Sequence, residues 1–273
     1  VDTALETNQK NKLLYASDCF NSTFSNFTVQ GQVNLPVRIN AANYEDSLNN
    51  SVFTNFNFYN AGQASVEGGN YVIDNWTWVN PKYKDYTDGD ATTLSIQGSE
   101  NTVINNLNIF NTTPTERAII RLSGTSKVAF NNLHTQGAFQ VTTQETGTGK
   151  LIFNSPTHND PFNFDDGAFR LYSFDGSGNT SDILIKNASF ILDNDQTGVN
   201  AGLVSYRDHG GSLIIDNISI TEVGSFNLNC VVCDLDTDED NLAILNSDFS
   251  NVNFTTNEIV RDSSLPTSLL AIV

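Results

Sequence analysis

Residues 103–109 read Val-Ile-Asn-Asn-Leu-Asn-Ile, and this short phrase returns along most of the chain. Its core is an apolar residue, any residue and an Asn, followed by an apolar, a polar and an apolar residue. Copies are found at Phe24–Val29, Phe53–Phe58, Ile73–Trp78, Phe130–Leu133, Ile185–Phe190, Ile215–Ile220 and Ile244–Phe249, with a weaker copy at Ile152–Asn154. The Asn residues of successive copies are about 20 to 33 positions apart, a period that indicates a solenoid of stacked repeats.

The residues within the phrase predict the kind of solenoid. Apolar and polar residues alternate on both sides of the Asn, and Val, Ile and Phe favour strands, so each copy predicts two short strands. Asn suits the bend between them because it tolerates the left-handed backbone region and can hydrogen-bond locally. In a stack of strands about 4.8 Å apart, equivalent amides can bond to one another. We therefore expect an asparagine ladder that satisfies buried amides, with Asn106 buried and Asn108 pointing outward.

A third strand precedes most copies of the phrase, across a Gly or Asp turn. Examples are Leu94–Gln97, Ile120–Leu122, Phe169–Leu171 and Leu203–Ser205. Three strands per turn of chain with an Asn corner resemble the right-handed parallel β-helix of the pectin-lyase-like superfamily. The resemblance covers about residues 15 to 260 and implies an all-β solenoid of about nine rungs with an asparagine ladder. It implies no single activity, because this scaffold hosts lyases, glycosidases, phage tailspikes and autotransporter passengers.

The composition is that of an acidic chain with few charges. The 273 residues include 31 acidic and 13 basic side chains, which give a net charge of −18, yet only 16% of the residues are charged. Such a chain repels nucleic-acid backbones and anionic membrane surfaces, so we exclude both as partners. Polyuronates are disfavoured for the same reason. Apolar runs fall well short of the roughly 18 residues of a spanning helix, so we expect no membrane insertion in this segment.

The uninterrupted repeat favours one elongated domain. We assign residues 15–273 to a single parallel β-helix domain. Residues 1–14 are more polar and lack the phrase, so we assign them to an N-terminal cap or extension. The apolar run Leu265–Val273 ends the chain without a polar cap. We expect that further chain or another subunit covers this end.

One set of residues is a candidate catalytic site: Asp165, Asp166, Asp175, Asp208 and His209. If residues 171–173 and 204–205 belong to equivalent strands, Asp175 and Asp208 lie in equivalent turns of adjacent rungs, close enough for a pair of glycosidase carboxylates. Segments 164–167 and 208–210 resemble signatures of β-helix polygalacturonases, although the Asn-Thr-Asp and Arg-Ile-Lys elements are missing. Tyr172, Phe174 and Tyr206 would supply aromatic rings beside the carboxylates. Acidic turns are also expected in any acidic solenoid.

The acidic segment 234–240 is a second candidate site. Asp234, Asp236 and Asp238 offer the oxygen ligands that a hard cation such as Ca²⁺ prefers. The Gly and the terminal Glu of an EF-hand loop are missing, and a solvated acidic turn between strands explains the same residues. We expect no cofactor, with Ca²⁺ as the open alternative.

These observations predict a secreted or surface-displayed β-helix that serves as an adhesive or structural stalk. It is most similar to an autotransporter passenger or a bacterial surface adhesin segment, and it would present loops and a flat, Asn/Thr-rich face to a host or surface glycan or protein. The alternative is a polysaccharide-acting hydrolase or phage tailspike depolymerase that uses the carboxylate set as a glycoside hydrolase. We predict an extracellular or cell-surface location, and we favour binding over catalysis.

Overall fold

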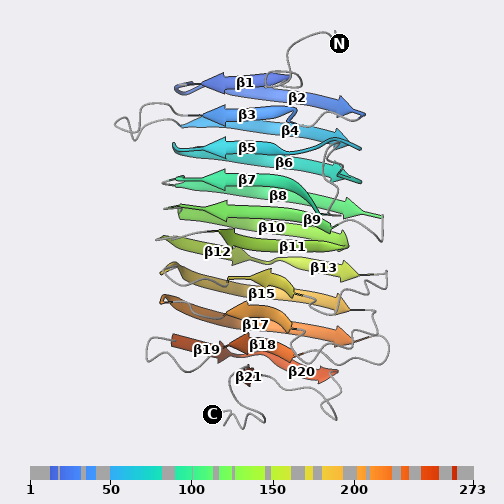
Figure 1. The fold of residues 1–273 in the computed structure, drawn as a ribbon, viewed down its shortest axis with the longest axis vertical. Coiled ribbons are helices and arrows are strands. Elements are labelled where there is room, and N and C mark those ends of the chain that lie inside the picture. Colours follow the sequence, from blue (N-terminus) through green and yellow to red (C-terminus); the bar gives the residue numbers. More distant parts are fainter. Residues whose placement is uncertain are drawn as a thin grey trace.

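The computed structural model of the chain is a stack of strands along one axis, with the first described strand, β1 (Leu14–Ser17), and the last, β21 (Val260–Asp262), at opposite ends of the stack (Figure 1). It describes residues 13–17, 19–31, 35–40, 50–81, 90–99, 101–112, 117–124, 127–144, 149–160, 170–174, 180–192, 202–206, 210–222, 229–233, 241–251 and 260–262. Over these residues the only regular secondary structure is β-strand, and none of them forms a helix long and apolar enough to cross a membrane.

Two parallel sheets make up the stack. Sheet A consists of β1 (Leu14–Ser17), β3 (Val37–Asn40), β5 (Ala64–Glu67), β7 (Asp90–Gln97), β9 (Arg117–Ser123), β11 (Phe139–Gln144), β14 (Arg170–Ser173), β16 (Gly202–Tyr206), β18 (Asn229–Cys233) and β21 (Val260–Asp262). Sheet B consists of β2 (Thr23–Gln30), β4 (Ser51–Tyr59), β6 (Tyr71–Val79), β8 (Thr102–Asn111), β10 (Lys127–Gly137), β12 (Lys150–Asn154), β13 (Thr157–Asp160), β15 (Asp182–Leu192), β17 (Ser212–Glu222), β19 (Asn241–Leu245) and β20 (Asp248–Asn251).

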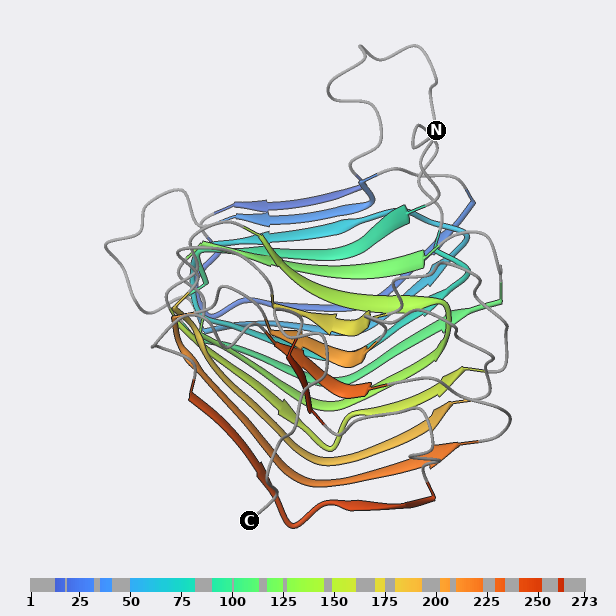
Figure 2. The same ribbon diagram turned by 60° about the horizontal axis from the view of Figure 1, so that its bottom comes forward.

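The chain alternates between the sheets, so each rung contains one strand of sheet A and the following strand or strand pair of sheet B. Figure 2 shows that sheet B bends along its length while sheet A lies opposite it. We call the part of each sheet B strand before the bend the first arm and the part after it the second arm. In β8, the first arm is Thr102–Asn105 and the second arm is Leu107–Asn111. The molecule is therefore a three-sided parallel β-solenoid, as the repeated phrase predicts.

The bend is made by one left-handed residue per rung. Asn106 has φ 53°, and the other corner residues with positive φ are Asn26, Asn55, Asn75, Asn132, Ser155, Asn187, Asn217 and Asn246. Asn is among the few residues with a side chain that visit this region routinely. In the weaker copy of the phrase the corner falls on Ser155 and not on Asn154, which lies one residue earlier. The phrase thus predicts the bend correctly in all other copies.

Amides at this corner bond from rung to rung, and the described part of the ladder contains two lines. Along the corner itself, Asn55 donates to Asn26 (3.3 Å), Asn75 to Asn55 (2.8 Å), Asn132 to Asn106 (3.2 Å) and Asn217 to Asn187 (2.9 Å). One residue earlier, Asn131 donates to Asn105 (2.9 Å) and Asn154 to Asn131 (3.4 Å). Asn187 then bonds to Asn154 (3.3 Å), which carries the ladder past Ser155.

The ladder lies on the outside of the coil, which corrects the expectation that Asn106 is buried. Asn106 is exposed, while Ile104 and Leu107 on either side of the bend are fully buried. A left-handed residue interrupts the strand alternation, so the side chains of Asn105 and Asn106 both point outward. The amides therefore bond to one another at the surface. Asn108 is partly exposed, as expected for an outward position.

The interior is apolar, and its side chains stack in register along the axis. Phe56 stacks on Trp76 with ring centroids 4.9 Å apart, and Phe58 stacks on Trp78 at 4.1 Å. These four rings are buried. Because parallel pairing places equivalent residues on adjacent strands, similar side chains stack face to face, a favourable arrangement for aromatic rings when they are offset.

The expected count of about nine rungs is not matched, because ten strands stack in sheet A over the described residues. The count rested on nine copies of a phrase that belongs to sheet B, and the described chain both begins and ends on sheet A, at β1 and β21. Residues 1–12 lie outside the described residues, so the N-terminal cap stays a prediction.

Candidate functional site

The strands that would carry the predicted catalytic set are adjacent, but the set itself lies outside the described residues. β14 pairs with β16 in the expected register, with Ser173 opposite Ser205. The set Asp165, Asp166, Asp175, Asp208 and His209 belongs to segments that the structure does not describe. The three predicted aromatic neighbours are described, and they are Tyr172, Phe174 and Tyr206.

These three rings face the interior, which corrects their assignment as substrate-stacking groups. Tyr172, Phe174 and Tyr206 are almost completely buried. Burial raises the pKa of the Tyr172 hydroxyl well above its ordinary value, and this ring also packs edge-on against Phe190. The alternation of the strand points them into the core, so they are unavailable to a ligand on the outside of sheet A.

The predicted Ca²⁺ ligands Asp234, Asp236 and Asp238 also lie outside the described residues. Over the part of the chain that the structure describes, no three His, Cys, Asp or Glu side chains gather closely enough to hold a metal ion. The Ca²⁺ site therefore stays a prediction.

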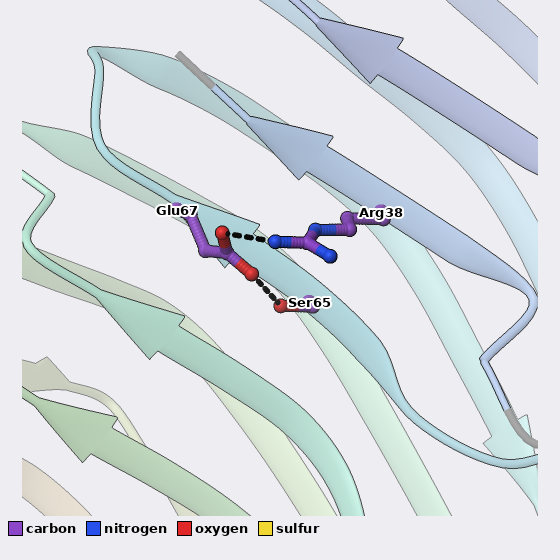
Figure 3. Close-up of polar contacts among 3 residues, drawn as sticks. All are labelled: Arg38, Ser65 and Glu67. Carbon is purple, nitrogen blue, oxygen red and sulfur yellow. Dashed lines mark hydrogen bonds and ion pairs between the residues drawn. The ribbon is translucent and has the colours of Figure 1, made fainter. Parts of the chain in front are cut away.

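The outer face of sheet A is polar and carries an ion pair. Arg38 Nη2 donates to Glu67 Oε2 at 2.7 Å, and Ser65 Oγ donates to Glu67 Oε1 at 2.9 Å (Figure 3). On the following strands the register places Ser95 and Arg121 in the same line as Arg38 and Ser65. The guanidinium group of Arg38 is already satisfied in part by Glu67, so this face is polar without a concentrated charge.

The outer face of the second arm carries a longer and more regular set of polar groups. One hydrogen-bonding side chain per rung lies in register along nine rungs. We name this line the polar row, and it consists of Thr28, Asn57, Thr77, Asn108, His134, Thr157, Ser189, Ser219 and Asp248. Every member is at least partly exposed.

Neighbouring members of the polar row interact weakly in some places and closely in others. His134 Nδ1 lies 2.6 Å from Thr157 Oγ1, whereas Asn108 Nδ2 reaches Thr77 Oγ1 only at 3.5 Å. At the far end, hydrogen bonds from Ser250 lower the pKa of the Asp248 carboxyl. The Asn and Thr groups in the middle of the row thus keep donors and acceptors free for a ligand, since each can make several hydrogen bonds.

Aromatic rings flank the polar row on one side and the asparagine ladder flanks it on the other. Tyr59 is 39% exposed two residues beyond the row in β4. Phe110 occupies the equivalent position in β8, partly exposed, with its ring 5.5 Å from that of His134. Tyr and Phe rings offer flat apolar faces, and the polar row offers hydrogen bonds beside them. A sugar chain bound on this face would contact both the aromatic rings and the polar row.

Comparisons with known proteins do not narrow this assignment, because no family model, curated protein or solved structure matches the chain. The sequence predicts a flat, Asn/Thr-rich face, but the pattern as described above does not identify its residues. The signal that locates the polar row is the second residue after each corner, read through all copies of the phrase: Thr28 follows Asn26 by two positions, as Asn108 follows Asn106. Alignment of the copies on their corner residue identifies the whole row.

Proposed function

We propose that this β-solenoid is an adhesive surface protein that binds a neutral glycan along the polar row of the second arm. The observation that supports the proposal best is the row itself, nine hydrogen-bonding side chains in parallel register. The strands are spaced about 4.8 Å apart, so the row repeats its donors and acceptors at a constant interval. A polymer of similar units is the ligand that suits such a repeating surface.

A neutral ligand suits the charges of the molecule. The chain carries a net charge of −18, which disfavours a polyanion. All members of the polar row have uncharged hydroxyl or amide side chains except His134 and Asp248. Hydroxyl-rich sugars can exchange hydrogen bonds with such groups while their apolar faces pack on the Tyr59 and Phe110 rings.

The finer assignments belong to the same proposal. We infer an extracellular or cell-surface location and a relationship to autotransporter passengers or other bacterial adhesins of the pectin-lyase-like β-helix type. The solenoid fold and the low content of charged residues support this inference, since an elongated scaffold can hold a binding face away from a surface. The hydrolase alternative would depend on Asp175 and Asp208, which lie outside the described residues.

The test is a binding assay on a panel of insoluble and immobilised neutral polysaccharides. We expect the wild-type protein to be retained by at least one polysaccharide, and the triple variant Thr77→Val, Asn108→Val, Thr157→Val to be released. The substitutions keep side-chain size and strand preference but remove the hydrogen-bonding groups. Ser95→Ala with Thr142→Val makes the same kind of change on sheet A and should leave retention unaltered.

Two outcomes would overturn the proposal. Retention of the triple variant at wild-type strength would exclude the polar row as the binding face. Release of reducing ends from the retained polysaccharide, abolished by Asp175→Asn with Asp208→Asn, would favour the hydrolase alternative. Absence of retention on a broad panel of neutral polysaccharides would also count against a glycan-binding role.

A further inference from the structure

The outer face of the first arm differs from the other two faces because its central line is apolar. One apolar residue per rung lies in register over eight successive rungs. We name this line the apolar stripe, and it consists of Val52, Val72, Val103, Ala129, Ile152, Leu184, Ile214 and Ala243. At about 4.8 Å per rung the stripe is roughly 34 Å long.

The stripe is at the surface. All eight members are partly exposed, and Ile214 is 37% exposed. Their immediate neighbours in the chain, such as Ile104 beside Val103 and Ile215 beside Ile214, fill the interior and are completely buried. Scattered apolar residues on a surface are ordinary, but a continuous apolar line along the whole length of a rod is typical of an interaction surface.

Positive and negative side chains are equal in number beside the stripe, whereas acidic residues are in excess in the chain as a whole. On one side the line two residues before the stripe contains Lys127, Lys150 and Asp182, and on the other side the line two residues after it contains Asp74, Lys186 and Asp216. This face thus carries three Lys and three Asp, whereas the whole chain has 13 basic and 31 acidic side chains. It is therefore a face on which two copies of this acidic molecule can approach without net repulsion.

We propose that the apolar stripe is the interface of a homodimer, in which two solenoids lie side by side in the same direction, related by a two-fold axis along the stripe. Such an axis places the line before the stripe of one subunit against the line after the stripe of the other. In one rung Asp182 then faces the partner's Lys186, and the symmetry repeats this pair. Lys127 faces only the uncharged Asn131 of the partner subunit, and Lys150 faces only Asn154 of the partner subunit.

The charges select this arrangement over the opposite one. A two-fold axis across the stripe at its middle would set the line before the stripe against itself, and Lys127 would meet Lys150 of the partner subunit. Like charges directly opposed at an interface are costly. Among the described residues the only ion pair is that of Arg38 with Glu67, so Lys150 and Lys186 have no acidic partner within this part of the subunit. Their side chains are available to a second copy.

Sedimentation velocity over a range of protein concentrations tests the interface. We expect the wild-type protein to have twice the subunit mass of 29.9 kDa, and Ile152→Lys with Leu184→Lys to have the subunit mass. Asn57→Lys with Thr77→Lys, the same charge change on the second arm, should leave the dimer intact. Circular dichroism would verify that each variant keeps its strand content. The proposal would be overturned if the wild-type protein is still a monomer at about 100 μM. It would also be overturned if the second-arm control variant is a monomer.

Charge exchange tests the direction of the two rods. Asp182→Lys and Lys186→Asp should each weaken the dimer about tenfold, and the two together should restore it to within a few-fold, since the pair is then reversed. Asp182 also accepts a hydrogen bond from Ser212 Oγ at 2.6 Å within the subunit. Ser212→Ala removes that bond without altering charge and should leave the dimer unchanged. Failure of the double variant to regain affinity would overturn the parallel arrangement.

Discussion

The two arms of sheet B share the same strands and the same alternation, yet their outer faces are opposite in character. The first arm presents the apolar stripe, and the second arm presents the polar row. In β8 the two faces are only five residues apart, with Val103 in the stripe and Asn108 in the row. The corner at Asn106 turns the chain from one to the other.

The fold restricts the residue types on the inward side of sheet B but not on its outward side. Inward positions are mostly apolar in both arms, because they fill the core of the solenoid. Outward positions carry no such requirement, so a consistent residue type over eight or nine rungs reflects what that face contacts. One interior line of the second arm does depart from the rule, at Thr135 and His158, and this departure gives the largest expected effect.

His158 is expected to make the second arm sensitive to acid. Its side chain is buried, with Nδ1 2.8 Å from Thr135 Oγ1 and Nε2 without a hydrogen-bond partner among the described residues. Burial, with a smaller contribution from the charge of His134, lowers the pKa of His158 from 6.5 to about 3. Since the unfolded chain takes up the proton first, folding stability is retained above pH 6.5 and is lost as the pH falls towards 3. The loss is at most roughly 5 kcal/mol, at 1.36 kcal/mol per pKa unit.

Urea unfolding at several pH values between 7 and 3 would measure this loss. His158→Phe should flatten the profile in that window, and Thr135 keeps a partner in this variant because its hydroxyl also donates to the Thr157 carbonyl at 3.3 Å. His134→Gln removes a histidine from the outer side of the same arm and should keep most of the acid sensitivity. Equal profiles for wild type and His158→Phe would contradict the assignment.

Adjacent residues of the first arm should differ sharply in their cost of truncation. Ile104 is fully buried, so Ile104→Ala should destabilise the fold by about 3 kcal/mol through lost burial and a residual cavity. Val103 faces outward in the stripe, and Val103→Ala should cost less than about 1 kcal/mol in the subunit. Urea unfolding at concentrations below dimer formation would measure both values. Similar losses at the two positions would show that the inward and outward lines are misassigned.

The sequence alone allowed the solenoid, the bend and the asparagine ladder to be predicted, because each repeats at a recognisable spacing. It did not show on which side of the coil the ladder lies, since strand alternation does not hold through a left-handed residue such as Asn106. The weaker copy misled for a related reason. There Asn154 matched the phrase, but Ser155 takes the corner conformation and Asn154 serves the ladder from one position earlier.

The apolar stripe was missed although its signal is present in every copy but the first. From Phe53 on, each inward residue that opens the phrase is preceded by another apolar residue, as in Val103-Ile104, Ile152-Phe153 and Ile214-Ile215. Two apolar residues in succession fit no simple alternation, so the pattern alone does not assign the first of each pair to a face of the sheet. Only the pairing register shows that these residues form one line on the outside. The predicted catalytic and Ca²⁺ residues all lie outside the described residues, in sequence segments that do not follow the repeat.

The corner between the two arms can be tested by separating backbone strain from ladder bonds. Asn106→Ala should cost about 1 to 2 kcal/mol, because Ala lacks the short polar side chain that lets Asn adopt a left-handed φ with little strain. Asn106→Gly loses the same amide bonds, to Asp74 at 3.0 Å and from Asn132, but avoids the strain and should cost less. Thermal unfolding of both variants would measure the difference. Equal losses would mean that the ladder bonds, and not the backbone, dominate the corner.

The smallest expected effect on stability comes from exchanging the character of the two faces at single positions. Asn108→Val places a strand-favouring residue at a partly exposed site, where the Asn108 amide donates to the Asn106 carbonyl at 3.2 Å and to Thr77 Oγ1 at a long 3.5 Å. Ile214→Asn makes the converse change in the stripe. Each should alter the free energy of unfolding by less than about 0.5 kcal/mol in the subunit, since neither removes core packing.

These two variants should differ in glycan binding and in dimer formation. Asn108→Val should weaken glycan retention several-fold, and the variant should remain a dimer like the wild-type protein. Ile214→Asn should weaken the dimer and leave glycan retention per subunit unchanged, because the polar row is on the other arm. A stability loss above about 1.5 kcal/mol for Asn108→Val would instead indicate that the polar row is a structural part of the solenoid, held for its rung-to-rung hydrogen bonds and not for a ligand.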